Sequence, residues 1–123
     1  MSKLLAGLKV LVVEDEMLIM MMTEDMLTDL GCESVTAAAT VNAALALIDS
    51  QAFDIAMLDM NLNGAATNGL ADALAAHEVP FVFATGYTGY DPGQGHGDRP
   101  MLRKPFGLED LSAALTRLLA HRQ

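Results

Sequence analysis

The sequence predicts one α/β domain, built on a five-stranded parallel sheet in the order 2-1-3-4-5 with helices on both faces. Short apolar runs alternate along the chain with longer segments in which apolar residues recur at helical spacing. The short runs are apolar throughout, which is typical of strands buried on both faces of a parallel sheet. A chain of 123 residues suits one such domain, and we expect its core to span about residues 8–120.

The first strand is expected at residues 8–13 (LKVLVV), and it ends at the acidic group Glu14, Asp15 and Glu16. A helix should follow and stop at Gly31, since glycine commonly terminates helices. Its apolar residues at helical spacing are Met17, Leu18, Met21, Met22 and Leu30. We interpret the methionines among them as flexible core filling rather than as a binding surface.

A second strand and helix are expected at residues 35–39 and 41–48, with Thr40 capping the helix. The third strand (53–58), a short helix (69–77) and the fourth strand (80–84) follow. Met101 and Leu102 mark a short fifth strand. The last helix begins after Gly107, with its leucines on one side.

The segment 86–98 (GYTGYDPGQGHGD) is rich in glycine and contains Pro92, where many such folds place a fourth helix. Glycine costs about 1 kcal/mol relative to alanine in a helix and proline about 3. We therefore expect the fourth helix to be short or disordered. We also expect this segment to become ordered when the nearby site is modified or a partner docks.

Five alternating units fit the flavodoxin-like strand order, which places the first strand beside the third. Carboxyl ends of parallel strands meet at one edge of the sheet, where α/β folds bind their ligands. Glu14, Asp15 and Asp59 should therefore converge from two adjacent strands.

The stretch DMNLNG, which begins at Asp59, also matches the start of a calcium-binding EF-hand loop. Such a loop ends with a bidentate glutamate at its twelfth position, which here is Leu70. An EF-hand loop also follows a helix in the chain, whereas Asp59 follows a predicted strand. Calcium is accordingly not expected at Asp59.

Three converging carboxylates repel one another unless a cation or protons intervene. Oxygen ligands without His or Cys suit Mg²⁺ or Mn²⁺, and such ions often support phosphoryl transfer. Asp59 projects from a loop, which favours it over Asp15 as a phosphoryl acceptor. Thr85 and Lys104 follow the fourth and fifth strands, where a hydroxyl and an ammonium could contact a phosphoryl group. The alternative is an acidic rim that caps the first helix and is otherwise solvated.

Bulk composition excludes several classes of function. The formal charge of −9 and the absence of a basic run argue against a nucleic-acid partner. No apolar stretch is long enough to span a membrane and no signal-peptide pattern is present, so we expect a cytoplasmic protein. The lone Cys32 is expected to be a small buried or half-buried thiol.

Four motifs together resemble the receiver domain of bacterial response regulators: VVEDE (12–16), LDMNL (58–62), ATG (84–86) and RKPF (103–106). The resemblance implies that Asp59 accepts a phosphoryl group from a sensor histidine kinase. It implies that Asp15, Asp59 and the backbone carbonyl of Asn61 bind Mg²⁺, with Glu14 reaching the ion through water. Thr85 and Lys104 match the residues that sense the phosphoryl group, and the bond from Lys104 to Pro105 resembles the family's cis peptide.

A narrower resemblance covers PFVFATGY (80–87), which is similar to the signature of the FAT GUY response regulators. It implies a single-domain protein of stress signalling, a kinase of the HWE or a related type, and action through a downstream protein or as a phosphate relay or sink. Met101 stands where many receivers have an aromatic switch. Tyr87 or Tyr90 is therefore the expected reporter of activation.

Two other functions remain open. A haloacid-dehalogenase-type phosphatase also uses a nucleophilic Asp and Mg²⁺, but needs a second Asp where this chain has Asn61. A receiver-like protein-binding module that is never phosphorylated would need no acceptor at all. We expect no enzyme activity beyond self-catalysed phosphoryl transfer and autodephosphorylation.

Overall fold

Five strands form one parallel sheet, as predicted. The computed structural model describes residues 4–59, 61–62, 65–66, 68–85, 101–104 and 106–120, with the backbone alone for 61–62, 65–66 and 68. In spatial order the strands are β2 (Ser34–Ala38), β1 (Lys9–Val13), β3 (Ile55–Asp59), β6 (Phe81–Thr85) and β7 (Met101–Arg103). The expected order 2-1-3-4-5 is confirmed.

The register of the sheet aligns the carboxyl ends of its strands. Val13 of β1 lies opposite Leu58 of β3, so the residues after Val13 extend beside Asp59. Asp59 is in turn paired with Ala84, one residue before the end of β6. Thr85 is paired with Arg103, the last residue of β7. Four adjacent strands thus end at one edge.

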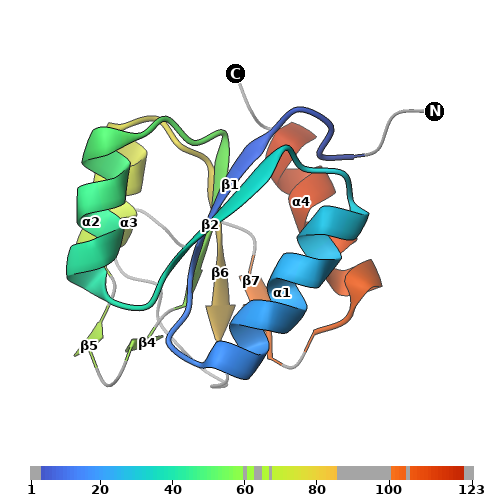
Figure 1. The fold of residues 1–123 in the computed structure, drawn as a ribbon, viewed down its shortest axis with the longest axis horizontal. Coiled ribbons are helices and arrows are strands. Elements are labelled where there is room, and N and C mark those ends of the chain that lie inside the picture. The colour runs from blue at the N-terminus through green and yellow to red at the C-terminus, as the bar shows by residue number, and fades with distance from the viewer. Residues whose placement is uncertain are drawn as a thin grey trace.

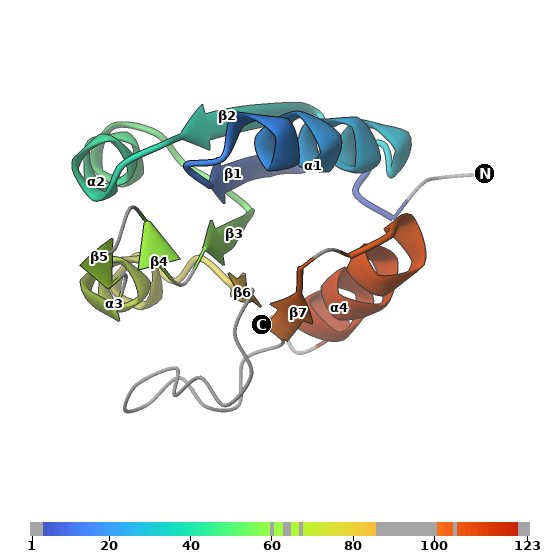
Figure 2. The same cartoon turned by 90° about the horizontal axis from the view of Figure 1, so that it is seen from below.

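Two pairs of helices cover the sheet. One face carries α2 (Val41–Ser50) and α3 (Asn68–Ala76), and the other carries α1 (Met17–Asp29) and α4 (Leu108–Ala120) (Figures 1 and 2). Thr40 caps α2 as expected, because its Oγ1 accepts a hydrogen bond of 3.1 Å from the backbone N–H of Ala43.

The sheet separates two hydrophobic cores, one under each pair of helices. The core under α2 and α3 contains Phe81 and Phe83, whose rings meet edge to face with centroids 5.4 Å apart. The core under α1 and α4 contains Leu27, Met57 and Leu115. Every residue of β3 is buried, which agrees with the continuous apolar sequence of its first four residues, and the burial extends to Asp59 at its end.

The interpretation of the α1 methionines as core filling is wrong. Met17, Leu18, Met21 and Met22 expose 77%, 71%, 55% and 50% of their surface. The face that packs on the sheet carries Met20, Thr23 and Leu27 instead. Thr23 can lie in this face because its hydroxyl donates a 2.8 Å hydrogen bond to the carbonyl of Ile19.

The segment after Asp59 is more regular than the loop that its composition predicts. Asn61–Leu62 (β4) and Ala65–Ala66 (β5) pair antiparallel as a separate two-stranded sheet. The expectation for residues 86–98, with Tyr87, Tyr90 and Pro92, lies outside the described residues. Across the part of the chain that is described, no helix has the length and apolar composition needed to cross a membrane.

Candidate functional site

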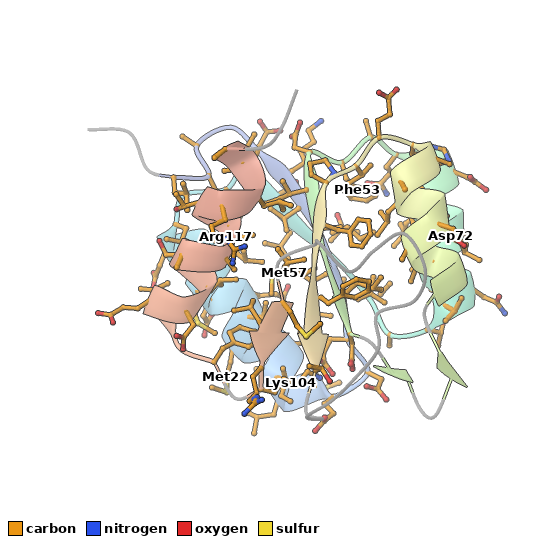
Figure 3. The ribbon with its side chains drawn as sticks, turned by 180° about the vertical axis from the view of Figure 1, so that it is seen from behind. Met22, Phe53, Met57, Asp72, Lys104 and Arg117 are labelled. Carbon is orange, nitrogen blue, oxygen red and sulfur yellow. The ribbon has the colours of Figure 1, made fainter. Side chains whose placement is uncertain are left out.

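The predicted site residues come from four strands whose ends lie side by side. Glu14 and Asp15 directly follow β1, Asp59 ends β3, Thr85 ends β6 and Lys104 follows β7. The backbone N–H of Lys104 donates a 2.8 Å hydrogen bond to the carbonyl of Thr85, which extends the pairing of β6 with β7 by one residue. Figure 3 shows Lys104 at this edge of the sheet.

Glu14, Asp15 and Asp59 form a compact group. One carboxylate oxygen from each lies within 4.8 Å of the other two. Glu14 and Asp59 are only 5% and 6% exposed, and Asp15 is half-buried. The cluster is therefore not the solvated acidic rim considered as an alternative. Nor does it cap α1 in the usual way, because Glu16 at the cap position makes no side-chain hydrogen bond to the helix.

Lys104 supplies the positive charge of the site. Its Nζ lies 2.6 Å from Oε1 of Glu14 and 3.1 Å from Oδ2 of Asp59, and its side chain is 11% exposed. Burial alone would lower the pKa of Lys104, but hydrogen bonds to and attraction by the two carboxylates outweigh it and raise that pKa. Lys104 is therefore an ammonium at neutral pH.

Burial and hydrogen bonding also act in opposite directions on the pKa of Glu14. Burial raises the pKa of the Glu14 carboxyl, and the neighbouring charge of Asp59 adds to the rise. The hydrogen bond from Lys104 and one of 3.1 Å from the backbone N–H of Glu16 to Oε2 oppose it. Both oxygens of Glu14 are thus engaged within the protein.

Thr85 and Asn61 complete the predicted set. Thr85 is 3% exposed and lies on the strand beside Asp59. Asn61 begins β4, two residues after Asp59, and its backbone pairs with Ala66 of β5. Pro105, and with it the expected cis peptide, lies outside the described residues.

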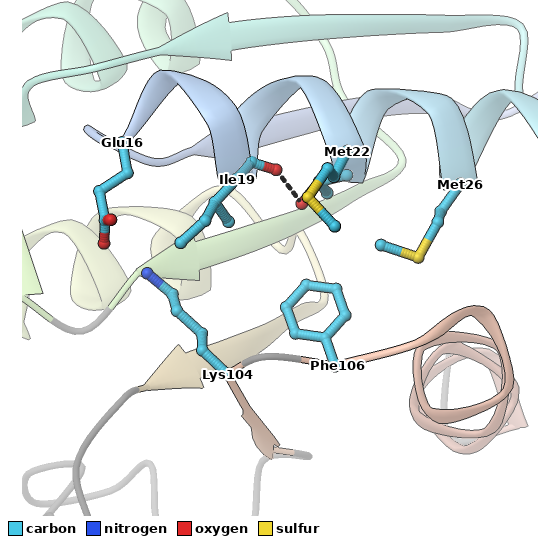
Figure 4. Close-up of a pocket in the computed structure, with 7 residues that line it drawn as sticks. Glu16, Ile19, Met22, Met26, Lys104 and Phe106 are labelled. Carbon is cyan, nitrogen blue, oxygen red and sulfur yellow. Dashed lines mark hydrogen bonds between the residues drawn. The ribbon is translucent and has the colours of Figure 1, made fainter.

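Sequence reasoning missed an apolar pocket next to this cluster. A cavity of about 260 Å³ lies between α1 and the residues Lys104 and Phe106, which follow β7. Its lining residues are Glu16, Ile19, Met22, Thr23, Met26, Lys104 and Phe106 (Figure 4). The sequence contained part of the information needed to predict this pocket, because two of its lining residues, Lys104 and Phe106, lie two positions apart in the RKPF motif.

The donor set of the cluster fits a hard divalent cation. It offers three carboxylates, and Mg²⁺ prefers oxygen ligands with one or two carboxylates and retained water.

The model of the response regulator receiver domain matches residues 10–116. This chain belongs to that family. SdrG from Sphingomonas melonis Fr1 is 43% identical over 94% of this chain and 97% of its own, with a TM-score of 0.80. The BeF3-activated conformation of SdrG, from Pseudomonas melonis Fr1, is 44% identical over 93% and 98%, with a TM-score of 0.78.

A receiver protein from Sinorhizobium medicae WSM419 has 25% identity over 95% of this chain and 98% of its own, with a TM-score of 0.84. None of the curated proteins compared with this receiver domain matches it.

Proposed function

We propose that this receiver domain is a phosphoacceptor, and that Asp59 takes a phosphoryl group from a sensor histidine kinase in a Mg²⁺-dependent reaction. The observation that carries the proposal is the buried group of Asp59, Glu14 and Lys104, joined by contacts of 2.6 and 3.1 Å. A purely structural ion pair needs only one carboxylate for the lysine. Here Lys104 contacts two carboxylates, those of Glu14 and Asp59, and the carboxylate of Asp15 lies beside them.

In the proposed transfer, a carboxylate oxygen of Asp59 attacks the phosphorus atom of a phosphohistidine. The P–O bond forms as the P–N bond breaks, and the electron pair of that bond returns to the imidazole of the kinase. The ammonium of Lys104 then pairs with the transferred group, and the hydroxyl of Thr85 donates to one of its oxygens. The domain needs no further enzyme activity beyond this self-catalysed transfer and its own dephosphorylation.

Mg²⁺, or Mn²⁺ in its place, would be held by Asp15, Asp59 and the backbone carbonyl of Asn61, with Glu14 acting through water. When bound, the ion neutralises the charge of the incoming phosphoryl oxygens. A haloacid-dehalogenase-type phosphatase is disfavoured, because Asn61 carries an amide where that mechanism needs a carboxylic acid.

The finer assignment is to the FAT GUY response regulators of stress signalling, with a kinase of the HWE or a related type and a cytoplasmic location. The PFVFATGY sequence supports it. In this role the phosphorylated form binds a downstream protein or passes the group on. A segment 86–98 that becomes ordered on phosphorylation, reported by Tyr87 or Tyr90, would create the altered surface.

The test is intact-mass spectrometry after incubation with acetyl phosphate and Mg²⁺. Wild type should gain the mass of one phosphoryl group, and excess EDTA should abolish the gain. Asp59→Asn should not be labelled, whereas Asp49→Asn, which changes an exposed carboxylate on α2, should label like wild type.

Labelling of Asp59→Asn at the wild-type level would place the acceptor elsewhere. A wild-type protein that is folded, is never labelled by acetyl phosphate and shows no binding of the phosphoryl mimic beryllofluoride would favour the alternative of a protein-binding module that is not regulated by phosphorylation.

A further inference from the structure

We infer that three exposed methionines of α1, Met17, Met21 and Met22, form a reversible oxidation site, at which a peroxide turns the surface beside the carboxylate cluster from apolar to polar. Together with Leu18, these side chains make up what we call the methionine patch. The reaction does not involve Asp59. It therefore goes beyond the proposed function and gives the domain a second chemical input.

The first argument is the concentration of exposed sulfur on one helix. Methionine occupies five of the 13 positions of α1. Of the six large apolar side chains that are exposed in the described part of the chain, four belong to the methionine patch. Met17 is 77% exposed, whereas Met20 is 8% exposed. A peroxide in solution therefore reaches the sulfur atoms of the patch directly, while the sulfur of Met20 is shielded by the core.

The oxidation needs only the thioether and the peroxide. A lone pair of the sulfur attacks one oxygen of hydrogen peroxide, and the S–O bond forms as the O–O bond breaks. The proton on the attacked oxygen moves to the departing hydroxide, which leaves as water. The sulfur is oxidised and the peroxide is reduced. The product is a polar sulfoxide, which methionine sulfoxide reductases convert back to the thioether.

The second argument is that the fold tolerates this change. All three methionines lie outside the two hydrophobic cores, because the side of α1 that packs on the sheet carries Met20, Thr23 and Leu27. A sulfoxide at an exposed position keeps its oxygen in water, so no unpaired polar group is buried. Oxidation should therefore change the surface of α1 without unfolding it.

The third argument is the extent and place of the change. Positions 17, 18, 21 and 22 are neighbours on the surface of a helix, so their side chains form one continuous patch. Oxidation of the three methionines leaves Leu18 as the apolar member of the patch. Met17 begins α1 two residues after Asp15, and Met22 lines the apolar pocket together with Phe106 (Figure 4). The patch thus borders the carboxylate cluster without including any of its carboxylates.

The test begins with graded hydrogen peroxide, followed by tandem mass spectrometry of proteolytic peptides. In native protein the three methionines of the patch should each gain an oxygen atom at least roughly tenfold faster than Met20, because a buried sulfur reacts only when the structure opens. The four rates should converge in urea. Equal native rates for the neighbours Met20 and Met21 would overturn the inference, as would loss of the helical circular dichroism signal in the oxidised protein.

Retention on a phenyl hydrophobic-interaction column measures the change in surface polarity. We expect peroxide-treated wild type to elute at a higher ammonium sulfate concentration than untreated protein. A variant that combines Met17→Leu, Met21→Leu and Met22→Leu keeps an apolar patch without sulfur, so peroxide should shift its elution much less. An unchanged elution of oxidised wild type, or an equal shift in this triple variant, would contradict the inference.

Met101→Leu is the matched control, because Met101 is an exposed methionine on β7. Peroxide should shift its elution as far as that of wild type. If Met101→Leu abolished the shift and the triple variant retained it, the oxidation site would lie on β7 and the inference would be wrong.

A last measurement uses wild type alone. Treatment of the oxidised protein with methionine sulfoxide reductases for both sulfoxide epimers should restore its original elution. A shift that persists after complete reduction of the sulfoxides would show that oxidation damages the fold rather than switching its surface. None of these measurements involves phosphorylation, so an unlabelled Asp59 would reject the proposed function and leave their results unchanged.

Discussion

Cys32 is a residue whose surroundings make a clean prediction, because it is the single cysteine of the chain. It lies half-buried beside the core under α1 and α4. Burial raises the pKa of the Cys32 thiol above its ordinary value of 9.0, and a hydrogen bond to its own backbone opposes the rise only in part. At pH 9 the folded protein should therefore hold less thiolate than the unfolded chain.

We predict that the alkylation rate of Cys32 in native protein has its midpoint above pH 9.0, and in urea near that value. Iodoacetamide labelling followed by mass spectrometry across this range measures both. Since the pKa is higher in the folded state, the contribution of the thiol to stability is fully present below pH 9.0 and is lost as pH rises through the folded pKa. A native midpoint below the unfolded one would contradict the assignment to burial.

The site residues were predictable one by one, and their mutual contacts only in part. Glu14, Asp15, Asp59, Thr85 and Lys104 each adjoin an apolar strand, so the alignment of parallel strand ends was enough to bring them together. The sequence did not indicate which carboxylate Lys104 would contact most closely. The shorter contact of Lys104 is with Glu14, which depends on side-chain rotamers and burial that spacing alone does not specify.

At the scale of elements, α1 shows why helical spacing can assign the wrong face. Methionines occur on both sides of this helix, and a threonine occupies the buried side. The spacing of the apolar residues correctly predicted a helix, but it assigned the wrong side of that helix to the core. The buried face follows from how β1 leads into the helix, which the sequence pattern does not encode.

Adjacent methionines of α1 give a matched pair that tests this assignment. Met20 is 8% exposed in the core, and Met21 is 55% exposed. We predict that Met20→Ala lowers the free energy of unfolding by about 2–5 kcal/mol, because it leaves a cavity. Met21→Ala should change it by no more than about 0.5 kcal/mol. Urea denaturation measures both values, and a similar loss for the two would reverse the orientation of the helix.

The cap of α2 is a second element with a measurable contribution. Thr40→Ala removes the hydroxyl that accepts from Ala43, and should cost about 1 kcal/mol within a range of roughly 0.5–2. Thr116→Ala is the control, since that exposed hydroxyl donates to the carbonyl of Ser112 inside α4 and satisfies no free helix end. Its effect should stay within about 0.5 kcal/mol. Equal midpoints in urea for Thr40→Ala and wild type would show that the cap contributes nothing.

For the whole molecule, the decisive feature is a sheet that keeps its two cores apart. Ile48 belongs to the core under α2 and α3, and Ile55 to the one under α1 and α4. We predict that Ile48→Val and Ile55→Val each cost about 0.5–1.5 kcal/mol. In the double variant the losses should add to within about 0.5 kcal/mol, because the two side chains belong to separate cores on opposite faces of the sheet. A larger coupling energy from urea denaturation would mean that the sheet transmits strain between its faces.

The sheet order was predictable from a general rule, because alternating apolar strands and helices allow few right-handed parallel arrangements. The short pairing of β4 with β5 was not, since the residues between Asp59 and α3 have the composition of a loop. Such local pairing depends on how the chain reverses after the sheet edge, and the Asn and Gly residues there are compatible with several turn types.

The contact of Lys104 with Asp59 spans 45 positions of the chain. A ribosome adding about 5–20 residues per second makes the carboxylate roughly 2 to 9 seconds before the lysine that neutralises it. During that interval β2, β1 and β3 have all been synthesised, and they are neighbours in the finished sheet. The nascent chain can therefore assemble three strands with its acidic residues gathered and still lacking their ammonium. A nascent domain arrested before β7 should accordingly depend more on divalent cations than the completed one.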